Sequence, residues 1–156
     1  MKKIVINTQH GGFSLSPLGL KRWAELNGKE CYFFKTNPYC KYEPLTLEEA
    51  SEEKYFWNAY TVPNPEDVLP DQSNWCEMTD EEKEASNNLY EKYSLSNGRS
   101  FERDDPTLVQ VVKELKKKAN GACASLKVVS IPDDVEWEIE EYDGAEWISE
   151  VHRTWA

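Results

Sequence analysis

Short apolar runs and one-sided apolar stretches alternate along the first third of the chain, which predicts strands and helices in turn. Residues 4–6 are all apolar, as is typical of a strand buried on both faces. Ser16 and Pro17 form a favourable helix start, and the apolar face that follows ends at Asn27. Residues 31–34 predict a second strand. The first 35 residues therefore indicate a strand–loop–helix–strand unit.

The last third of the chain has a similarly clear pattern. A helix is expected to begin at Pro106 behind an aspartate cap, to carry apolar residues at helical spacing, and to end at Asn120-Gly121. Residues 126–131 predict a strand. Residues 135–155 predict a hairpin around Asp143-Gly144, a dipeptide typical of a two-residue turn.

The hairpin turn also predicts a register. It places Ile139 opposite Ile148, Trp137 opposite Glu150 and Val135 opposite His152, all on one mostly apolar face. A carboxylate and an imidazole on such a face need a partner, a ligand or a subunit contact. A one-residue bulge would instead turn Trp147, Arg153 and Trp155 inward, and the sequence leaves both registers open.

The middle of the chain, residues 36–99, is less regular. A strand is expected within 54–62, and Thr79 opens a helix that runs towards Tyr93. We interpret the chain as a single α/β domain, residues 1–156, with residues 36–99 as an elaboration inserted in the core. The expected architecture is a mixed sheet with helices packed on it and a C-terminal antiparallel hairpin.

Charge and composition narrow the range of partners. The formal net charge of −11 disfavours binding to long nucleic acids, although a few local cations can still hold a small anion. No apolar stretch predicts a signal peptide or a membrane span, so we expect a cytoplasmic protein without membrane association. Four scattered cysteines and two histidines disfavour a zinc site, and no cofactor is expected.

The loop after the first strand is the first candidate site. Gly11 and Gly12 let a ligand approach the backbone at a helix N-terminus, and His10, Phe13 and Ser14 lie in the same loop. The loop matches neither of the common glycine-rich phosphate motifs. The alternative is that the two glycines only turn the chain.

Asp104 and Asp105 are the most catalytic-looking pair, since adjacent carboxylates can hold Mg²⁺. The alternative, which we favour, is that an aspartate caps the helix at Pro106. Arg103 beside them either clamps a phosphate or pairs with a carboxylate. No nucleophile motif is present, so an enzyme is not expected.

The C-terminal residues His152, Arg153 and Trp155 are the last candidates. An indole and a guanidinium together suit a base and its phosphate. Nearby, Glu136, Glu138 and Glu140 alternate along one strand, which indicates a solvated face or a contact surface for a basic partner.

Three segments of the chain carry a family resemblance: Lys3-Ile-Val-Ile-Asn7 with Gly11-Gly-Phe-Ser-Leu-Ser16, then Arg103-Asp-Asp-Pro106, then residues 131–155. Together they resemble a widespread family of small tailed-bacteriophage proteins, over residues 1–34 and 101–156. The resemblance extends to phage anti-CBASS sponge proteins, which bind cyclic dinucleotide immune signals and hold them away from host effectors. It identifies no individual ligand-binding residue.

The resemblance implies a phage anti-defence protein that sequesters a cyclic dinucleotide or related nucleotide, without hydrolysis, in the cytoplasm of the infected bacterial host. A homo-oligomer is expected, because such proteins often bind at subunit interfaces and aromatic residues are abundant here. Two alternatives stay open. One is an acidic protein–protein inhibitor of a host defence enzyme. The other is a small nucleotide phosphodiesterase that uses Asp104, Asp105 and His152.

Overall fold

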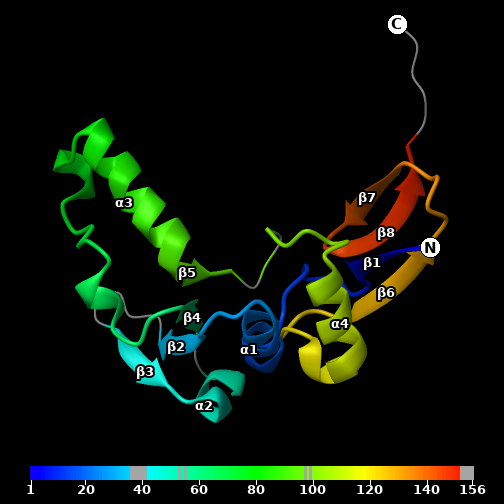
Figure 1. Ribbon diagram of the computed structural model, residues 1–156, viewed down its shortest axis with the longest axis horizontal. Helices are drawn as coiled ribbons and strands as arrows, with labels where there is room; N and C mark the ends of the chain where they lie inside the picture. The colour runs from blue at the N-terminus through cyan, green and yellow to red at the C-terminus, as the bar shows by residue number, and fades with distance from the viewer. Residues whose placement is uncertain (36–41, 53, 55, 97, 99, 152–156) are drawn as a thin grey trace, which may run out of the picture. The chain divides into compact units, whose positions relative to one another are not determined.

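The computed structural model describes residues 1–35, 42–52, 54, 56–96, 98 and 100–151. The chain forms two compact units, shown in Figure 1. The terminal unit comprises residues 1–27 and 97–156, and the central unit comprises residues 28–96.

The terminal unit is built around a pair of antiparallel strands. Strand β1 (Lys2–Asn7) pairs with β6 (Leu126–Ile131), so that Val5 lies opposite Val128. Helices α1 (Pro17–Leu26) and α4 (Pro106–Leu115) pack with Val5 in one apolar core. Its fully or almost fully buried members are Val5, Phe13, Leu15, Leu108, Val109, Val111, Val112 and Ala119.

Strand β1 is buried on both faces, as the run of three apolar residues predicts. Ile4 and Ile6 point away from Val5 because side chains alternate along a strand, and they are 0% and 5% exposed. The hairpin of β7 (Trp137–Tyr142) and β8 (Ala145–Glu150) lies beside β1 (Figure 1). Strand β1 is therefore central to the terminal unit.

The helix starts follow the expected local chemistry. The Ser16 hydroxyl caps α1 by accepting a hydrogen bond from the Gly19 N–H. The Asp105 carboxylate caps α4 by accepting one from the Thr107 N–H. Helix α4 nevertheless ends at Leu115, before the lysine run, and a 3₁₀ turn (Lys116–Ala119) follows. Lys116 has a positive φ of 54°. The Ser16 backbone N–H donates to the Ala119 carbonyl, so the turn is stabilised by the start of α1.

The central unit contains an antiparallel sheet of four strands in the order β3–β2–β4–β5. These strands are β2 (Tyr32–Lys35), β3 (Glu43–Leu45), β4 (Trp57–Tyr60) and β5 (Ser94–Leu95). The helical segments are α2 (Leu47–Ser51), α3 (Asp80–Tyr93) and the 3₁₀ turns Pro65–Asp67 and Trp75–Glu77. Thr79 caps α3, as its capping pattern predicts.

Strand β2 does not share a sheet with β1, although both belong to the expected strand–loop–helix–strand unit, because β2 pairs with β3 and β4 in the central unit. The strand expected within 54–62 is present as β4. Phe34 of β2 and Tyr60 of β4 form an aromatic core with Leu69, and this core explains why β2 and β4 pair.

The α/β class and the C-terminal antiparallel hairpin are confirmed. The pairings that the structure describes are antiparallel and are distributed over three sheets. In the hairpin, Trp137 lies opposite Glu150 and Ile139 opposite Ile148, which is the register without a bulge. The expected pair of Val135 with His152 lies outside the described residues. No helix in the described part of the chain is long and apolar enough to cross a membrane.

Candidate functional site

The glycine loop of the terminal unit contacts the hairpin turn. The Gly11 N–H donates to the Asp143 carbonyl at 3.1 Å. A Cβ atom on Gly144 would lie 2.3 Å from the Gly12 nitrogen, and one on Gly11 would lie 2.7 Å from the Cys123 Cβ. Such distances exclude a side chain. The glycines therefore allow two backbones to approach each other closely.

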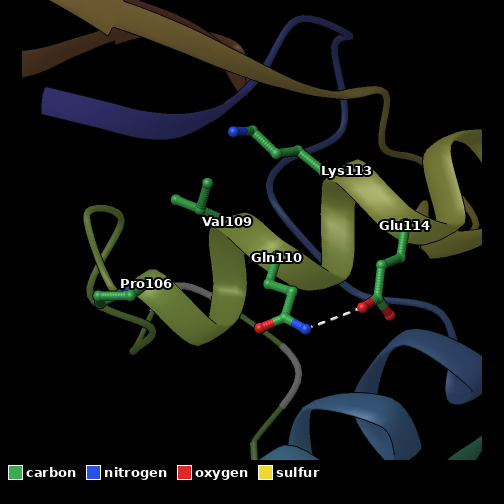
Figure 2. A pocket seen from close by; sticks show the side chains of 5 residues that line it. All are labelled: Pro106, Val109, Gln110, Lys113 and Glu114. Atoms are coloured by element: carbon green, nitrogen blue, oxygen red, sulfur yellow. Dashed lines mark hydrogen bonds between the residues drawn. The ribbon is translucent and has the colours of Figure 1, made fainter. Parts of the chain in front are cut away.

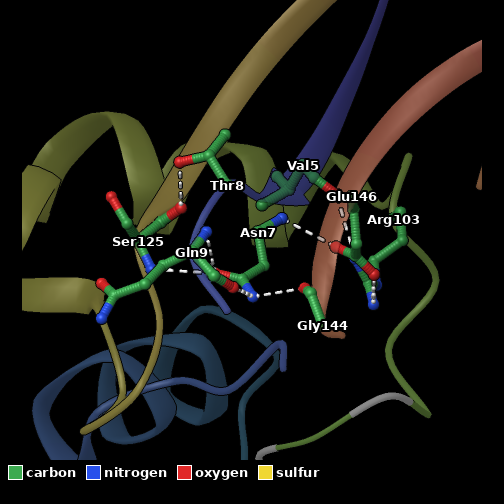
Figure 3. Close-up of polar contacts among 8 residues, drawn as sticks. All are labelled: Val5, Asn7, Thr8, Gln9, Arg103, Ser125, Gly144 and Glu146. Atoms are coloured by element: carbon green, nitrogen blue, oxygen red, sulfur yellow. Dashed lines mark hydrogen bonds and ion pairs between the residues drawn. The ribbon is translucent and has the colours of Figure 1, made fainter. Parts of the chain in front are cut away.

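Asn7, at the end of β1, ties this loop to the hairpin (Figure 3). Its side-chain amide donates to the carbonyls of Gln9 and Gly144, at 2.7 and 2.8 Å. Its side-chain oxygen accepts a hydrogen bond from the Ser125 N–H at 2.9 Å. Asn7 is fully buried, so its polar groups need these partners. The loop is a stabilised structural junction.

Arg103 is bound to a carboxylate that the sequence analysis did not single out. Its guanidinium donates two hydrogen bonds to Glu146 of β8, at 2.7 and 2.9 Å. The two side chains are only 10% and 4% exposed. The guanidinium also stacks on the Phe13 ring, 3.8 Å from its centre. Of the two functions considered for Arg103, the structure shows pairing with a carboxylate.

The Arg103–Glu146 pair satisfies one edge of strand β1. The Val5 N–H donates to the Arg103 carbonyl at 2.8 Å, and the Arg103 guanidinium donates to the Val5 carbonyl at 3.4 Å. The Asn7 N–H donates to the Glu146 carboxylate at 2.7 Å. The backbone N–H and C=O groups of β1 that point away from β6 therefore form hydrogen bonds with the Arg103 and Glu146 side chains and with the Arg103 carbonyl.

The other candidates of the loop have separate environments. Phe13 is 4% exposed and belongs to the core. The Ser14 carbonyl accepts a hydrogen bond from the Gly121 N–H at 2.9 Å. His10 is exposed: its ring lies 3.3 Å from the Asp143 carbonyl and meets the Tyr142 ring edge-on. Among the candidate residues of this loop, His10 and Gly11 are exposed, Ser14 is half-buried, and Gly12 and Phe13 are buried.

Asp105 has the structural function that the helix pattern favours. One carboxylate oxygen accepts the Thr107 N–H, and the other accepts the Trp23 indole N–H at 3.0 Å. Asp104 is exposed. Among the residues that the structure describes, no three His, Cys, Asp or Glu side chains are grouped to hold a metal ion.

The C-terminal candidates His152, Arg153 and Trp155 lie outside the described residues. Strand β8 runs away from the Asp143-Gly144 turn, so Val151 lies at the other end of the hairpin from the glycine loop. Six strand residues span about 20 Å. The structure brings Arg103, Gly11, Gly12, Phe13 and the hairpin turn together, and Val151 lies at the far end of the hairpin from that turn.

A shallow groove lies along one side of α4 (Figure 2). It has a volume of about 370 Å³ and is lined by Pro106, Val109, Gln110, Lys113 and Glu114. Its positions recur every three or four residues, so they form one stripe of the helix. Arg22 and Gln110 donate hydrogen bonds to the Glu114 carboxylate, which lowers its pKa and compensates its charge.

Two lysines meet at one end of the groove. The Lys113 side chain points from α4 towards β1 (Figure 2), where it contacts the amine of Lys3. This contact, with some loss of hydration, lowers the pKa of Lys113. Neither lysine forms an ion pair with a carboxylate in the described part of the chain. The groove therefore combines an apolar wall with uncompensated positive charge.

Sequence reasoning missed Glu146, Lys3 and Lys113. The hairpin register contained a signal for Glu146, since it places this carboxylate on the same face as Ile139 and Ile148. Lys3 and Lys113 are 110 positions apart, and no local pattern relates them.

No family model matches the chain, and no similarity to a curated protein or to a solved structure was found.

Proposed function

We propose that the chain is a phage anti-defence protein that binds and sequesters a cyclic dinucleotide or related nucleotide signal without hydrolysing it. It would act in the cytoplasm of the infected bacterial host. The observation that carries the proposal is the lysine pair at the end of the α4 groove. Two neighbouring ammonium groups repel each other, and a bound phosphate would relieve that repulsion.

The groove fits the two parts of a nucleotide. A phosphate between Lys3 and Lys113 accepts hydrogen bonds from both amines. The sugar or base then lies along the apolar wall at Val109 and Pro106. The size of the groove falls in the usual range for small ligands, about 300–1,000 Å³.

A sequestering site also needs to exclude water. The groove is lined on one side by a single helix, and sites that hold ligands tightly bury most of the ligand surface. We propose that a second copy of the chain covers the bound nucleotide, which accounts for the expected homo-oligomer. The C-terminal Arg153 and Trp155 then become candidates for the covering subunit.

The first experiment identifies the nucleotide that the protein releases when it is denatured. The purified protein is incubated with cyclic dinucleotides, separated from free ligand and heat-denatured, and the released nucleotide is identified. Recovery of the intact cyclic form supports the proposal. A linear product would indicate the phosphodiesterase instead. Absence of bound nucleotide for every compound tested would overturn the proposal.

Matched variants locate the site. Lys3→Ala with Lys113→Ala should weaken nucleotide binding at least about tenfold, because both phosphate donors are lost. The control is Lys117→Ala with Lys127→Ala, which removes the same charge from two exposed lysines. An equal loss of nucleotide affinity in both double variants would show that the net charge, and not the site, causes the effect. Arg153→Ala is expected to abolish binding if the C-terminal segment covers the ligand.

A further inference from the structure

The outer face of the C-terminal hairpin carries two parallel rows of side chains. Side chains alternate along each strand, so Glu136, Glu138 and Glu140 share this face. Beside them runs a second row of Trp147, Ser149 and Val151. The register sets Glu140 opposite Trp147 and Glu138 opposite Ser149. An acidic row thus lies directly beside a row that includes two exposed apolar side chains, Trp147 and Val151.

Trp147 is held in a defined position on this face. Trp147 is one of the large apolar residues that remain exposed, at 46% of its surface. The indole N–H donates to the Glu140 carboxylate at 2.9 Å, and the Ser149 hydroxyl donates to the same oxygen. A fixed aromatic ring loses little conformational entropy when a partner covers it, and tryptophan is common among residues that dominate interfaces.

The charges of the face select the partner. Alternate residues on a strand are about 7 Å apart, so three carboxylates form a regular row. The carboxylates of Glu136 and Glu138 form no hydrogen bond or ion pair within the described part of the chain. A second copy of the face would bring like charges together. An extended segment with lysine or arginine at alternate positions would pair with Glu138 and Glu136 in turn.

We propose that the outer face of the β7–β8 hairpin is a docking surface for a basic, extended segment of a partner protein. The Glu136 and Glu138 carboxylates bind its cationic side chains, and Trp147, oriented by its hydrogen bond to Glu140, packs against one of their apolar stems or lies under its charged group. This surface is separate from the α4 groove of the proposed nucleotide site. It would give the chain a second, protein-directed function.

The test uses a synthetic peptide with alternating lysine and serine. A second peptide has the same composition, but its lysines are grouped at one end. Isothermal titration of the full-length protein should show the alternating peptide binding at least about tenfold more tightly. Similar affinities would overturn the proposal, because a matching spacing would then not be recognised. If free spermidine bound as tightly as the alternating peptide, the face would bind small cations in general, and the proposed peptide docking would be wrong.

Matched variants separate this face from the net charge. Glu136→Gln with Glu138→Gln should reduce binding of the alternating peptide at least about tenfold. The control removes two exposed carboxylates from α3, by Glu81→Gln with Glu84→Gln. Equal losses in the two double variants would contradict the proposal. Trp147→Ala tests the aromatic contact at unchanged charge, and unaltered affinity would exclude it.

Discussion

The Arg103 guanidinium and the Glu146 carboxylate form a bidentate ion pair, with hydrogen bonds of 2.7 and 2.9 Å, between residues 43 positions apart. Both side chains are almost fully buried. The carboxylate also accepts the Asn7 N–H, and the guanidinium reaches the Val5 carbonyl. The pair therefore joins strand β1, strand β8 and the segment before α4.

Removal of one partner from this pair should destabilise the protein strongly. Glu146→Ala leaves a buried guanidinium without its counterion, which costs about 3–5 kcal/mol. Chemical denaturation monitored by circular dichroism measures the loss. Glu150→Ala, an exposed carboxylate on the same strand, is the control and should cost much less. A double variant, Arg103→Met with Glu146→Leu, should recover part of the stability lost in Glu146→Ala.

Gly144→Ala should destabilise the protein more than Gly28→Ala. Both glycines have positive φ, at 86° and 70°, so alanine is strained at either position. Only at Gly144 would the new Cβ also meet backbone, 2.3 Å from the Gly12 nitrogen, whereas Gly28 faces open space. We expect a loss of about 1 kcal/mol at Gly28 and over 2 kcal/mol at Gly144.

Thermal unfolding of the two glycine variants measures this difference. If both lose the same stability, the close approach of the glycine loop to the hairpin turn has no energetic weight, and conformational strain alone explains the effect.

Asp105→Ala should weaken the start of α4. The variant loses the helix cap and leaves the Trp23 indole N–H without its acceptor, which together cost about 2 kcal/mol. Asp105→Asn keeps an acceptor for the cap and should retain more stability. Asp104→Ala, at an exposed position, is the control. A stable Asp105→Ala protein would refute the structural function of this residue.

Alkaline pH should destabilise the central unit through its tyrosines. Burial raises the pKa of both Tyr42 and Tyr60, and a hydrogen bond with Tyr90 raises that of Tyr42 further. A tyrosine with a higher pKa in the folded than in the unfolded chain contributes stability below the unfolded value, about 10. That contribution is lost as the pH rises above 10 towards the folded pKa.

Unfolding measured between pH 8 and 11 tests this expectation. Tyr42→Phe should flatten the decline in stability above pH 10, because the buried hydroxyl no longer ionises. Tyr142→Phe, at a residue that is 74% exposed, should leave the decline unchanged. An identical decline in Tyr42→Phe and the parent protein would show that other groups cause it.

Local signals in the sequence predicted the elements well where neighbouring residues decide the structure. Ser16, Thr79 and Asp105 cap their helices because each side chain reaches an amide two or three positions ahead. The Asp143-Gly144 turn predicts the hairpin, and the structure then selects the register without a bulge. These interactions need no information from distant parts of the chain.

Contacts between residues far apart in the sequence could not be predicted from these local signals. The end of α4 depends on Ser16, which donates to the carbonyl of Ala119 more than one hundred positions later. The first 35 residues were expected to form one strand–loop–helix–strand unit, but the aromatic core of the central unit holds β2 with β3 and β4. A strand's pattern reveals which face is apolar, and many partners can cover such a face.

The sequence by itself determined the α/β class, the helix starts and the hairpin turn, because each depends on residues close together in the chain. Only the tertiary structure decided the hairpin register, the pairing of Arg103 with Glu146 and the contact of Lys3 with Lys113. Ion pairs and like-charge contacts between distant segments depend on how the strands and helices pack, and that packing is set by the whole core.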